Sequence, residues 1–234
     1  MSDRVYHVRV GGEFACFTDP GLKVERCSYP VMTPSAARGL LEAIFWKPEF
    51  RWEIRTITVL KPIKQMSIMR NEIADRQSDK PIIIEHKRQQ RASLILKDVD
   101  YVIAAAMVLK PGVNNFGKYL DQFERKLEKG QCHHTPCLGT REFAAWFELG
   151  TGKEKPLESE RVNLQLGQML FDIAYKEDEE RQEISFHRHI ADGEKRIAKG
   201  YAHALYFEAE VKNGVLIVPR DKYRELYSLE GIYV

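Results

Sequence analysis

The chain has 234 residues, 44% hydrophobic and 30% charged, enough for one large globular domain or for a domain with a smaller appendage. A formal charge of +2 permits a nucleic-acid binder only if the basic residues cluster on one surface. Four Cys, an N-terminus without a signal segment and the lack of any apolar run of roughly 20 residues argue against secretion or membrane insertion. We therefore expect a cytoplasmic protein with reduced thiols.

The first half of the chain predicts strands and one amphipathic helix. Residues 6–10 alternate and are rich in β-formers, which predicts the first strand. Thr33-Pro34 is typical of a helix start, with a hydroxyl cap followed by Pro at the first helical position. Apolar residues then recur at helical spacing, at Ala37, Leu40, Leu41 and Ile44. We expect this helix to end before Pro48 and the next strand to cover residues 52–60.

A long polar stretch interrupts the β-rich middle of the chain. Residues 70–91 are mostly charged or polar, and they predict an exposed hairpin or a mobile loop. Two further strands are expected at 92–96 and 100–109, followed by a helix over 116–129. Residues 141–149 predict a closing strand.

The order of these elements over residues 4–149 is β-α-β-β-α-β, which is the order of a ferredoxin-like unit. Such a unit has an antiparallel sheet with two helices on one face. Its open face is the surface that RNA-recognition domains use for bases. The sequence thus predicts an α+β protein whose N-terminal domain, residues 1–150, is ferredoxin-like and resembles an RNA-recognition domain.

The last third of the chain predicts a small, mostly antiparallel β domain over residues 151–234. A linker-like segment, residues 150–159, separates it from the first part. A strand is expected at 165–175, and later strands form a hairpin over Asn213-Gly214, the strongest short turn signal in the chain.

The stretch of greatest functional interest is 115–147, where a helix with a basic face leads into a loop rich in His and Cys. An apolar stripe at helical spacing faces the core, at Phe116, Leu120, Phe123 and Leu127. Lys118, Arg125 and Lys129 fall on the opposite face, so three cations point away from the core together.

This stretch contains every group that RNA cleavage without a metal requires. A base must accept the proton of a 2′-OH, a cation must stabilise the charge on the phosphorus, and an acid must protonate the leaving oxygen. Lys118, Tyr119 and the loop residues His133, His134 and Arg141 supply these types of group.

A metal site is less well supported. Four side chains of zinc-ligand type, from Cys132 to Cys137, crowd into six residues, whereas a tetrahedral site takes pairs from two separated segments. We expect neither a metal nor another cofactor. His187 and His189 alternate on a predicted strand, and without a third ligand we interpret them as surface polar residues.

Each proposed catalytic side chain also has a structural interpretation. Lys118 would then be a solvated helix charge, and Tyr119 a half-buried aromatic flanking the apolar stripe. Arg141 would form an internal ion pair with Glu142 or Glu148.

Several strings of the sequence resemble the family-five subunit of the type I-C (Dvulg) CRISPR-associated system, a member of the RAMP superfamily. They lie in order at 29–48, 59–63, 115–123 and 130–143, and together they span most of residues 5–149. The resemblance implies an endoribonuclease that cuts the repeats of CRISPR precursor RNA without a metal. It also implies that the protein stays on the 5′ handle of the mature guide RNA, together with the other subunits of a type I-C surveillance complex.

The sequence departs from the family's cleavage triad at two positions. The triad is a Tyr in a YWKP-like string, followed by a Lys and a His in a GKH-like string. Here the first string holds Phe45 in place of the Tyr, and the second keeps Lys118 but holds Tyr119 in place of the His. Phe45 cannot exchange a proton, and a phenol with a pKa near 10 is a poor base at neutral pH.

Three accounts fit these departures: a relocated triad, another group serving in the loop, or a subunit that binds the repeat with little or no cleavage. We expect the first, with Lys118, Tyr119 and His134 as catalytic residues. The residues expected to contact RNA are Lys47, Arg125, Lys129, His133 and Arg141. The alternative is a non-catalytic subunit that caps the 5′ handle.

Overall fold

A computed structural model describes residues 4–22, 26–73, 75, 78–79, 81–113, 116–156, 163–189 and 195–231. Their strands form one sheet in the order β6-β1-β5-β3-β10-β9-β7, and β2, β4 and β8 pair outside this path. The strands are β1 (Val5–Ala15), β2 (Arg26–Cys27), β3 (Phe50–Val59), β4 (Gln65–Ile73), β5 (Arg88–Leu109), β6 (Trp146–Leu149), β7 (Leu164–Glu177), β8 (Ile184–His189), β9 (Lys195–Lys212) and β10 (Val215–Ile217). The helices are α1 (Pro34–Ile44), α2 (Ile84–Lys87), α3 (Phe116–Glu128) and α4 (Asp221–Leu229). Every pairing is antiparallel except that of β2 with β5.

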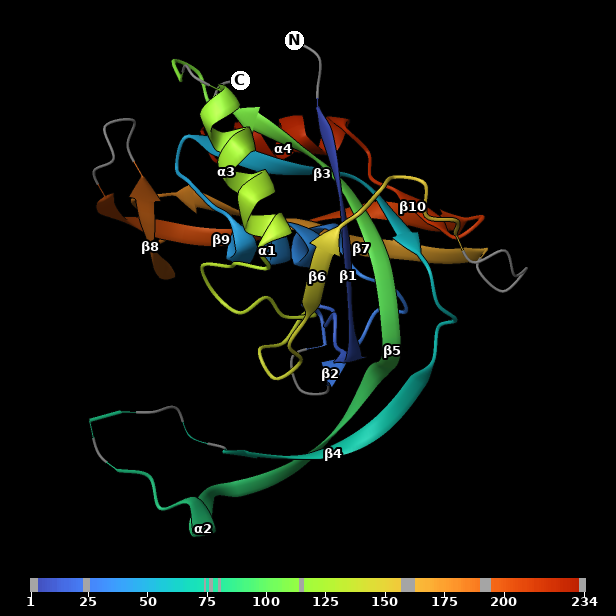
Figure 1. Cartoon of the computed structure of the whole chain (residues 1–234). Helices are drawn as coiled ribbons and strands as arrows, with labels where there is room; N and C mark the ends of the chain where they lie inside the picture. The colour runs from blue at the N-terminus through green and yellow to red at the C-terminus, as the bar shows by residue number, and fades with distance from the viewer. Residues whose placement is uncertain are drawn as a thin grey trace.

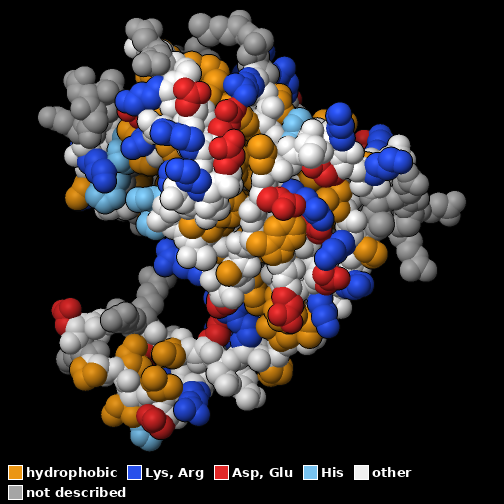
Figure 2. Space-filling view, in the orientation of Figure 1, with side chains coloured by type: hydrophobic (Ala, Val, Ile, Leu, Met, Phe, Trp, Pro, Cys, Tyr) orange, Lys and Arg blue, Asp and Glu red, His pale blue; other side chains and the backbone are white. Residues whose placement is uncertain are grey.

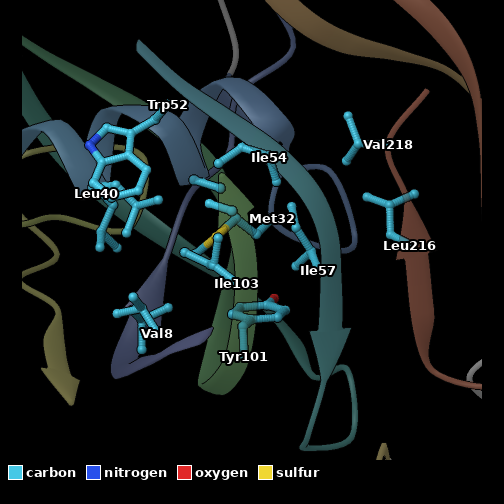
Figure 3. Packing of buried hydrophobic residues seen from close by; sticks show 14 of the residues in the cluster. Val8, Met32, Leu40, Trp52, Ile54, Ile57, Tyr101, Ile103, Leu216 and Val218 are labelled. Atoms are coloured by element: carbon cyan, nitrogen blue, oxygen red, sulfur yellow. The ribbon is translucent and has the colours of Figure 1, made fainter. Parts of the chain in front are cut away.

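The N-terminal half places α1 and α3 beside each other over the sheet (Figure 1). The side chain of Thr33 caps α1 by accepting a hydrogen bond from the amide of Ala36 at 3.2 Å, as the sequence predicts. All four apolar positions of the predicted stripe on α1 are buried. Figure 3 shows Leu40 of α1 near Trp52 of β3, within a core that also takes Val8 and Ile103 from the central strands.

The C-terminal strands extend this sheet. β10 pairs with β3, so that Leu216 lies opposite Ile57, and both side chains enter the core shown in Figure 3. The predicted hairpin at Asn213-Gly214 is confirmed, because both residues have positive φ, 50° and 75°. The expected linker is described only as far as residue 156, and its last residues lie outside the described part of the chain. The division at residues 150 and 151 stays a prediction.

Helix α4 is an element that the sequence does not predict. Tyr223, Leu226 and Tyr227 form its buried face at the spacing of an amphipathic helix, and α4 packs on β7. The Tyr223 hydroxyl accepts a hydrogen bond of 2.6 Å from the Ile54 amide, which ties α4 to β3. No helix among the described residues has the length and apolar character needed to cross a membrane.

A long two-stranded arm projects from the body, formed by β4, α2 and the first half of β5 (Figure 1). The expected hairpin at 70–91 is confirmed, but the two strands expected after it are one strand of 22 residues. Asp98 stands between those two segments with φ of 55°, and its carboxylate accepts a hydrogen bond of 2.7 Å from Lys61. β5 continues through this left-handed residue, because its register with β1 is the same on both sides of Asp98, with Gly12 opposite Val99 and Phe14 opposite Lys97.

Buried tyrosines make the stability of the fold sensitive to alkaline pH. Burial is the largest cause of the raised pKa values of Tyr101, Tyr223 and Tyr227, and the nearby Glu53 carboxylate adds to the rise at Tyr227. The unfolded chain releases these protons near pH 10, while the folded chain retains them. Stability is therefore complete below pH 10 and falls above it, by about 1.4 kcal/mol per tyrosine for each pH unit.

Urea unfolding measured between pH 8 and pH 11 tests this expectation. The Tyr101→Phe variant should lose roughly a third of the slope that these three phenols produce above pH 10. An unfolding free energy that stays constant to pH 11 would contradict the proposed burial effect.

Candidate functional site

Helix α3 presents a basic face to solvent, as predicted. Its buried residues are Tyr119, Leu120, Phe123 and Leu127, and Phe116 is half-buried. Lys118, Arg125 and Lys129 are exposed on the other side. Tyr119 therefore belongs to the packed face, while its neighbour Lys118 belongs to the solvated one.

The five cations expected to contact RNA or to act in catalysis carry no internal ion pair within the described part of the chain. They are Lys47, Lys118, Arg125, Lys129 and Arg141, and all five are exposed. The two carboxylates proposed as partners for Arg141 bind other residues, since Glu142 pairs with Arg70 at 2.7 Å and Glu148 with Arg9 at 3.1 Å. These five cations are thus available to an anionic partner.

The loop after α3 is fixed to the end of α1. The backbone amides of His133 and His134 both donate to the carbonyl oxygen of Ala43, at 2.9 and 3.0 Å. The two imidazole rings are exposed, and their centroids lie 4.3 Å apart. Because Ala43 precedes Lys47 by only four residues, the imidazole pair and this cation share one region of the surface.

A second anchor holds the loop further along. The Cys16 amide donates to the carbonyl oxygen of Leu138 at 2.9 Å, and the Leu138 side chain is fully buried. Gly139 has φ of +89°, and a Cβ built there would lie 1.9 Å from the Cys16 carbonyl oxygen, so only glycine fits. The loop also bonds to itself, from the Leu138 amide to the Phe143 carbonyl. The closing strand expected at 141–149 is therefore shorter and covers only β6.

Phe45 and Tyr119, where the resemblance implies a departure from the cleavage triad, are both packed against aromatic rings. Phe45 is 3% exposed and stacks on Phe50 and Phe123, with centroid distances of 5.4 and 6.3 Å. The Tyr119 ring lies 5.7 Å from Phe50. Burial, followed by the Glu49 carboxylate, raises the pKa of Tyr119, so this side chain remains a neutral phenol at pH 7.

Among the described residues, no three His, Cys, Asp or Glu side chains gather as a metal ligand set. In the loop, Cys132 is exposed and Cys137 is half-buried. Burial is the largest cause of the raised pKa of the Cys137 thiol.

A cavity of about 690 Å³ lies where the two halves of the chain meet. Its walls come from α1, β3, β7, β8, β9 and α4 together with the segments that follow α1 and β5. In Figure 2, pale blue His side chains gather beside blue Lys and Arg side chains on the left flank of the body. The same view shows an open hollow between the body and the arm.

A family model described as CRISPR-associated protein (Cas_Cas5) matches residues 5–219 of the chain. The chain belongs to the Cas5 family. A curated relative from Thermus thermophilus, named CRISPR pre-crRNA endoribonuclease Cas5d, is 54% identical over 95% of both chains. A relative of the same name from Mannheimia succiniciproducens is 39% identical, over 94% of this chain and 96% of its own. A crystal structure of a CRISPR-associated protein shares the fold, with a TM-score of 0.64 and 22% identity over 94% of each chain.

Family membership gives the Cas5 sequence strings a structural context. The string that contains Phe45 is the turn between α1 and β3, and the string that contains Lys118 begins α3. Phe123, the last residue of the second string, joins the two because its ring stacks on Phe45 of the first, with 6.3 Å between the centroids. The structure therefore brings the two strings together through a shared aromatic cluster.

Sequence reasoning missed the contact between Trp46 and His189. The two rings lie 4.8 Å apart, although the residues are distant in the chain. The strand pattern around His189 indicates only a surface polar residue, because it shows no partner in sequence. The feature of the sequence that could have indicated this contact is Trp46 itself, an aromatic residue between the end of the apolar helix and the basic residue Lys47.

Proposed function

We propose that this Cas5 protein binds the repeat stem-loop of CRISPR precursor RNA and cleaves it without a metal ion. The observation that carries the proposal is the set of five exposed cations without internal ion pairs among the described residues, one of which, Lys47, follows the helix end to which the exposed imidazole pair is hydrogen-bonded. The 54% identity to a pre-crRNA endoribonuclease supports the same activity. An exposed Lys or Arg without a carboxylate partner binds a phosphate more favourably, because no ion pair within the protein has to break when the RNA binds.

The proposed reaction uses the RNA's own 2′-OH as the nucleophile. This oxygen forms a bond to the adjacent phosphorus while the bond to the 5′-oxygen breaks, which leaves a 2′,3′-cyclic phosphate and a 5′-hydroxyl. His134 accepts the proton of the 2′-OH, and Lys118 stabilises the negative charge that develops on the phosphoryl oxygens. Tyr119, held as a neutral phenol, serves as a donor to the leaving oxygen and not as the base.

The proposed contacts divide the remaining cations by position. Arg125 and Lys129 continue the basic face of α3 beyond Lys118, and they hold phosphates of the stem. Lys47, His133 and Arg141 hold the RNA around the end of α1.

The fold supports a finer proposal for the N-terminal half. In the order β6-β1-β5-β3, with α1 and α3 on one face, this half is a ferredoxin-like unit into which the arm is inserted. Residues 151–234 then form a β-rich domain that continues the sheet. After cleavage the protein stays on the 5′ handle in the cytoplasm, together with the other subunits of the surveillance complex.

Cleavage in excess EDTA tests the mechanism. We expect one discrete cut in labelled repeat RNA, and no cut in a copy that carries a single 2′-deoxy substitution at the cut site. The rate should not change when Mg²⁺ is added. Cleavage of the 2′-deoxy copy, or loss of cleavage in EDTA, would contradict attack by the 2′-OH without a metal.

A non-catalytic handle-binding subunit is the second candidate. The burial of Phe45 at the position of the family's catalytic Tyr favours it, because this position carries no group that transfers a proton. Tight binding of the repeat with no product, with or without EDTA, would support this candidate.

A further inference from the structure

The cavity between the two halves of the chain contains groups that the proposed reaction does not use. Trp46 reaches it from the turn after α1, Lys110 from the end of β5 and His189 from the end of β8. Its volume of about 690 Å³ lies within the range of small-molecule sites, about 300–1,000 Å³. The cavity is therefore large enough for a ligand with a ring.

Most charged side chains in the cavity wall are already paired. Arg38 binds Asp172 at 2.6 Å, and Arg51 binds Glu230 at 2.7 Å. Glu177 accepts from Arg188 at 2.9 Å and from Arg196 at 2.6 Å. These pairs leave the wall nearly neutral outside the region of Lys110.

Lys110 is the exception. It is half-buried, and it forms no ion pair within the described part of the chain. Burial is the largest cause of its lowered pKa, the positive charges of Arg51 and Arg188 lower it further, and the carboxylates of Glu230 and Glu49 act in the opposite direction. A cation held close to other cations gains from an anion more than an exposed Lys does, because the anion relieves the repulsion.

Trp46 supplies a flat apolar surface in the same cavity, and His189 lies near both residues, because it contacts the Trp46 ring and the Lys110 charge contributes to its lowered pKa after burial and Lys195. Its side chain is 38% exposed, and its ring contacts the His189 ring with an interplanar angle of 63°. An exposed Trp face is a stacking surface for a nucleobase.

The cavity adjoins the proposed cleavage site. Trp46 lies between the buried Phe45 and the exposed Lys47 in sequence. The amide of Lys110 donates to the carbonyl of Glu49 at 2.9 Å, and the Glu49 carboxylate also acts on Tyr119. A strand of RNA that passes Lys47 and Tyr119 therefore reaches the cavity within a short distance.

We propose that the cavity holds one unpaired nucleotide of the RNA next to the stem, with its base against Trp46 and its phosphate at Lys110. This assignment rests on the proposed function, and it adds a recognition site to the cleavage site. His189 lies at the edge of the same nucleotide as a hydrogen-bonding group. The site gives a role to Trp46, which is exposed, and to Lys110, which has no ion pair among the described residues. Most other charged side chains that line the cavity form ion pairs.

Binding of two RNAs tests the proposal. One RNA carries the stem-loop with its single-stranded flanks, and the other is trimmed to the stem-loop alone. Lys110→Gln and Trp46→Ala should each weaken binding of the flanked RNA about tenfold and leave binding of the trimmed RNA unchanged. Lys97→Gln is the matched control, because Lys97 is an exposed Lys without an ion pair among the described residues and lies outside the cavity wall.

Two further measurements separate stacking from a loss of folding. Trp46→Phe should restore most of the affinity that Trp46→Ala loses, because a ring remains. Irradiation of flanked RNAs that carry 5-iodouridine at successive positions should crosslink Trp46 from one flanking position, as peptide mass spectrometry would show.

The outcomes of these tests distinguish this site from the cleavage proposal. If the wild-type protein binds both RNAs but cuts neither, the cleavage proposal fails. The effect of the cavity variants on the affinity for flanked and for trimmed RNA still tests whether the cavity binds a nucleotide. Wild-type affinity of both cavity variants for the flanked RNA overturns the assignment. An equal loss of affinity for both RNAs also overturns it. The same holds if the protein binds free adenosine monophosphate as tightly as it binds the flanked RNA.

Discussion

Replacing Lys118 with Ala is expected to lower the single-turnover rate of repeat cleavage about 100- to 1,000-fold, while the affinity for the repeat changes little. The reason is that Lys118 is exposed at the first turn of α3, next to the packed Tyr119, and carries no internal ion pair among the described residues. Its charge therefore acts on the phosphate whose charge increases in the transition state. The rate should be measured with protein in excess over labelled RNA at saturating concentration.

Lys129→Ala is the matched control, because Lys129 directly follows α3 and its amide still donates to the carbonyl of Arg125. Lys129 lies 11 residues beyond Lys118, about three helical turns, and we assign it to phosphate binding only. Its removal should weaken binding and reduce the dependence of affinity on salt, with no change of rate at saturation. If Lys118→Ala and Lys129→Ala lower binding and rate in the same proportion, the catalytic role of Lys118 is wrong.

Asp172→Ala is expected to lower the free energy of unfolding by about 3–5 kcal/mol, far more than the loss of an exposed ion pair would. Asp172 is 3% exposed and belongs to β7, whereas its partner Arg38 belongs to α1. The Arg38 guanidinium donates to both carboxylate oxygens, at 2.6 and 2.8 Å. Removal of the carboxylate leaves a partly buried cation that has only Glu42 as a partner among the described residues.

Urea unfolding at pH 7 measures this loss, and an exposed ion pair provides the comparison. Glu183 binds Arg181 at 2.6 Å, but both side chains are more than half exposed, so Glu183→Ala should cost less than about 1 kcal/mol. If Asp172→Ala destabilises the protein no more than Glu183→Ala does, the Arg38–Asp172 pair does not hold α1 to β7.

The elements predicted correctly are those whose signals are local. Thr33-Pro34 and the periodic residues after it specify α1, and Asn213-Gly214 specifies the hairpin between β9 and β10. The pairing of β10 with β3 depends on residues about 160 positions apart, and no local pattern encodes it. Helix α4 is short and rich in charged side chains, so its three buried residues give a weak periodic signal.

The candidate site follows the same division. The basic face of α3 and the His133–His134 pair could be predicted because each lies within one continuous segment. The helical spacing also allows Tyr119 to lie beside the apolar stripe. The aromatic partners of Phe45 and Tyr119 could not be predicted, because Phe123 packs on Phe45 and Phe50 on Tyr119 from about 70 or more positions away in sequence. The cavity leaves no signal in the sequence for the same reason, since its walls come from many separate elements.

Strand β5 is part of both the arm and the central sheet. Its first half pairs with β4 in the arm, and its second half lies between β1 and β3 in the centre of the sheet. No loop separates the halves, and Lys61 donates a hydrogen bond to Asp98, which lies between them. The arm is thus a direct extension of a strand that pairs with both β1 and β3 in the body. Because the two halves of β5 share one backbone without a loop, a change in the position of β5 in the sheet would move the base of the arm with it.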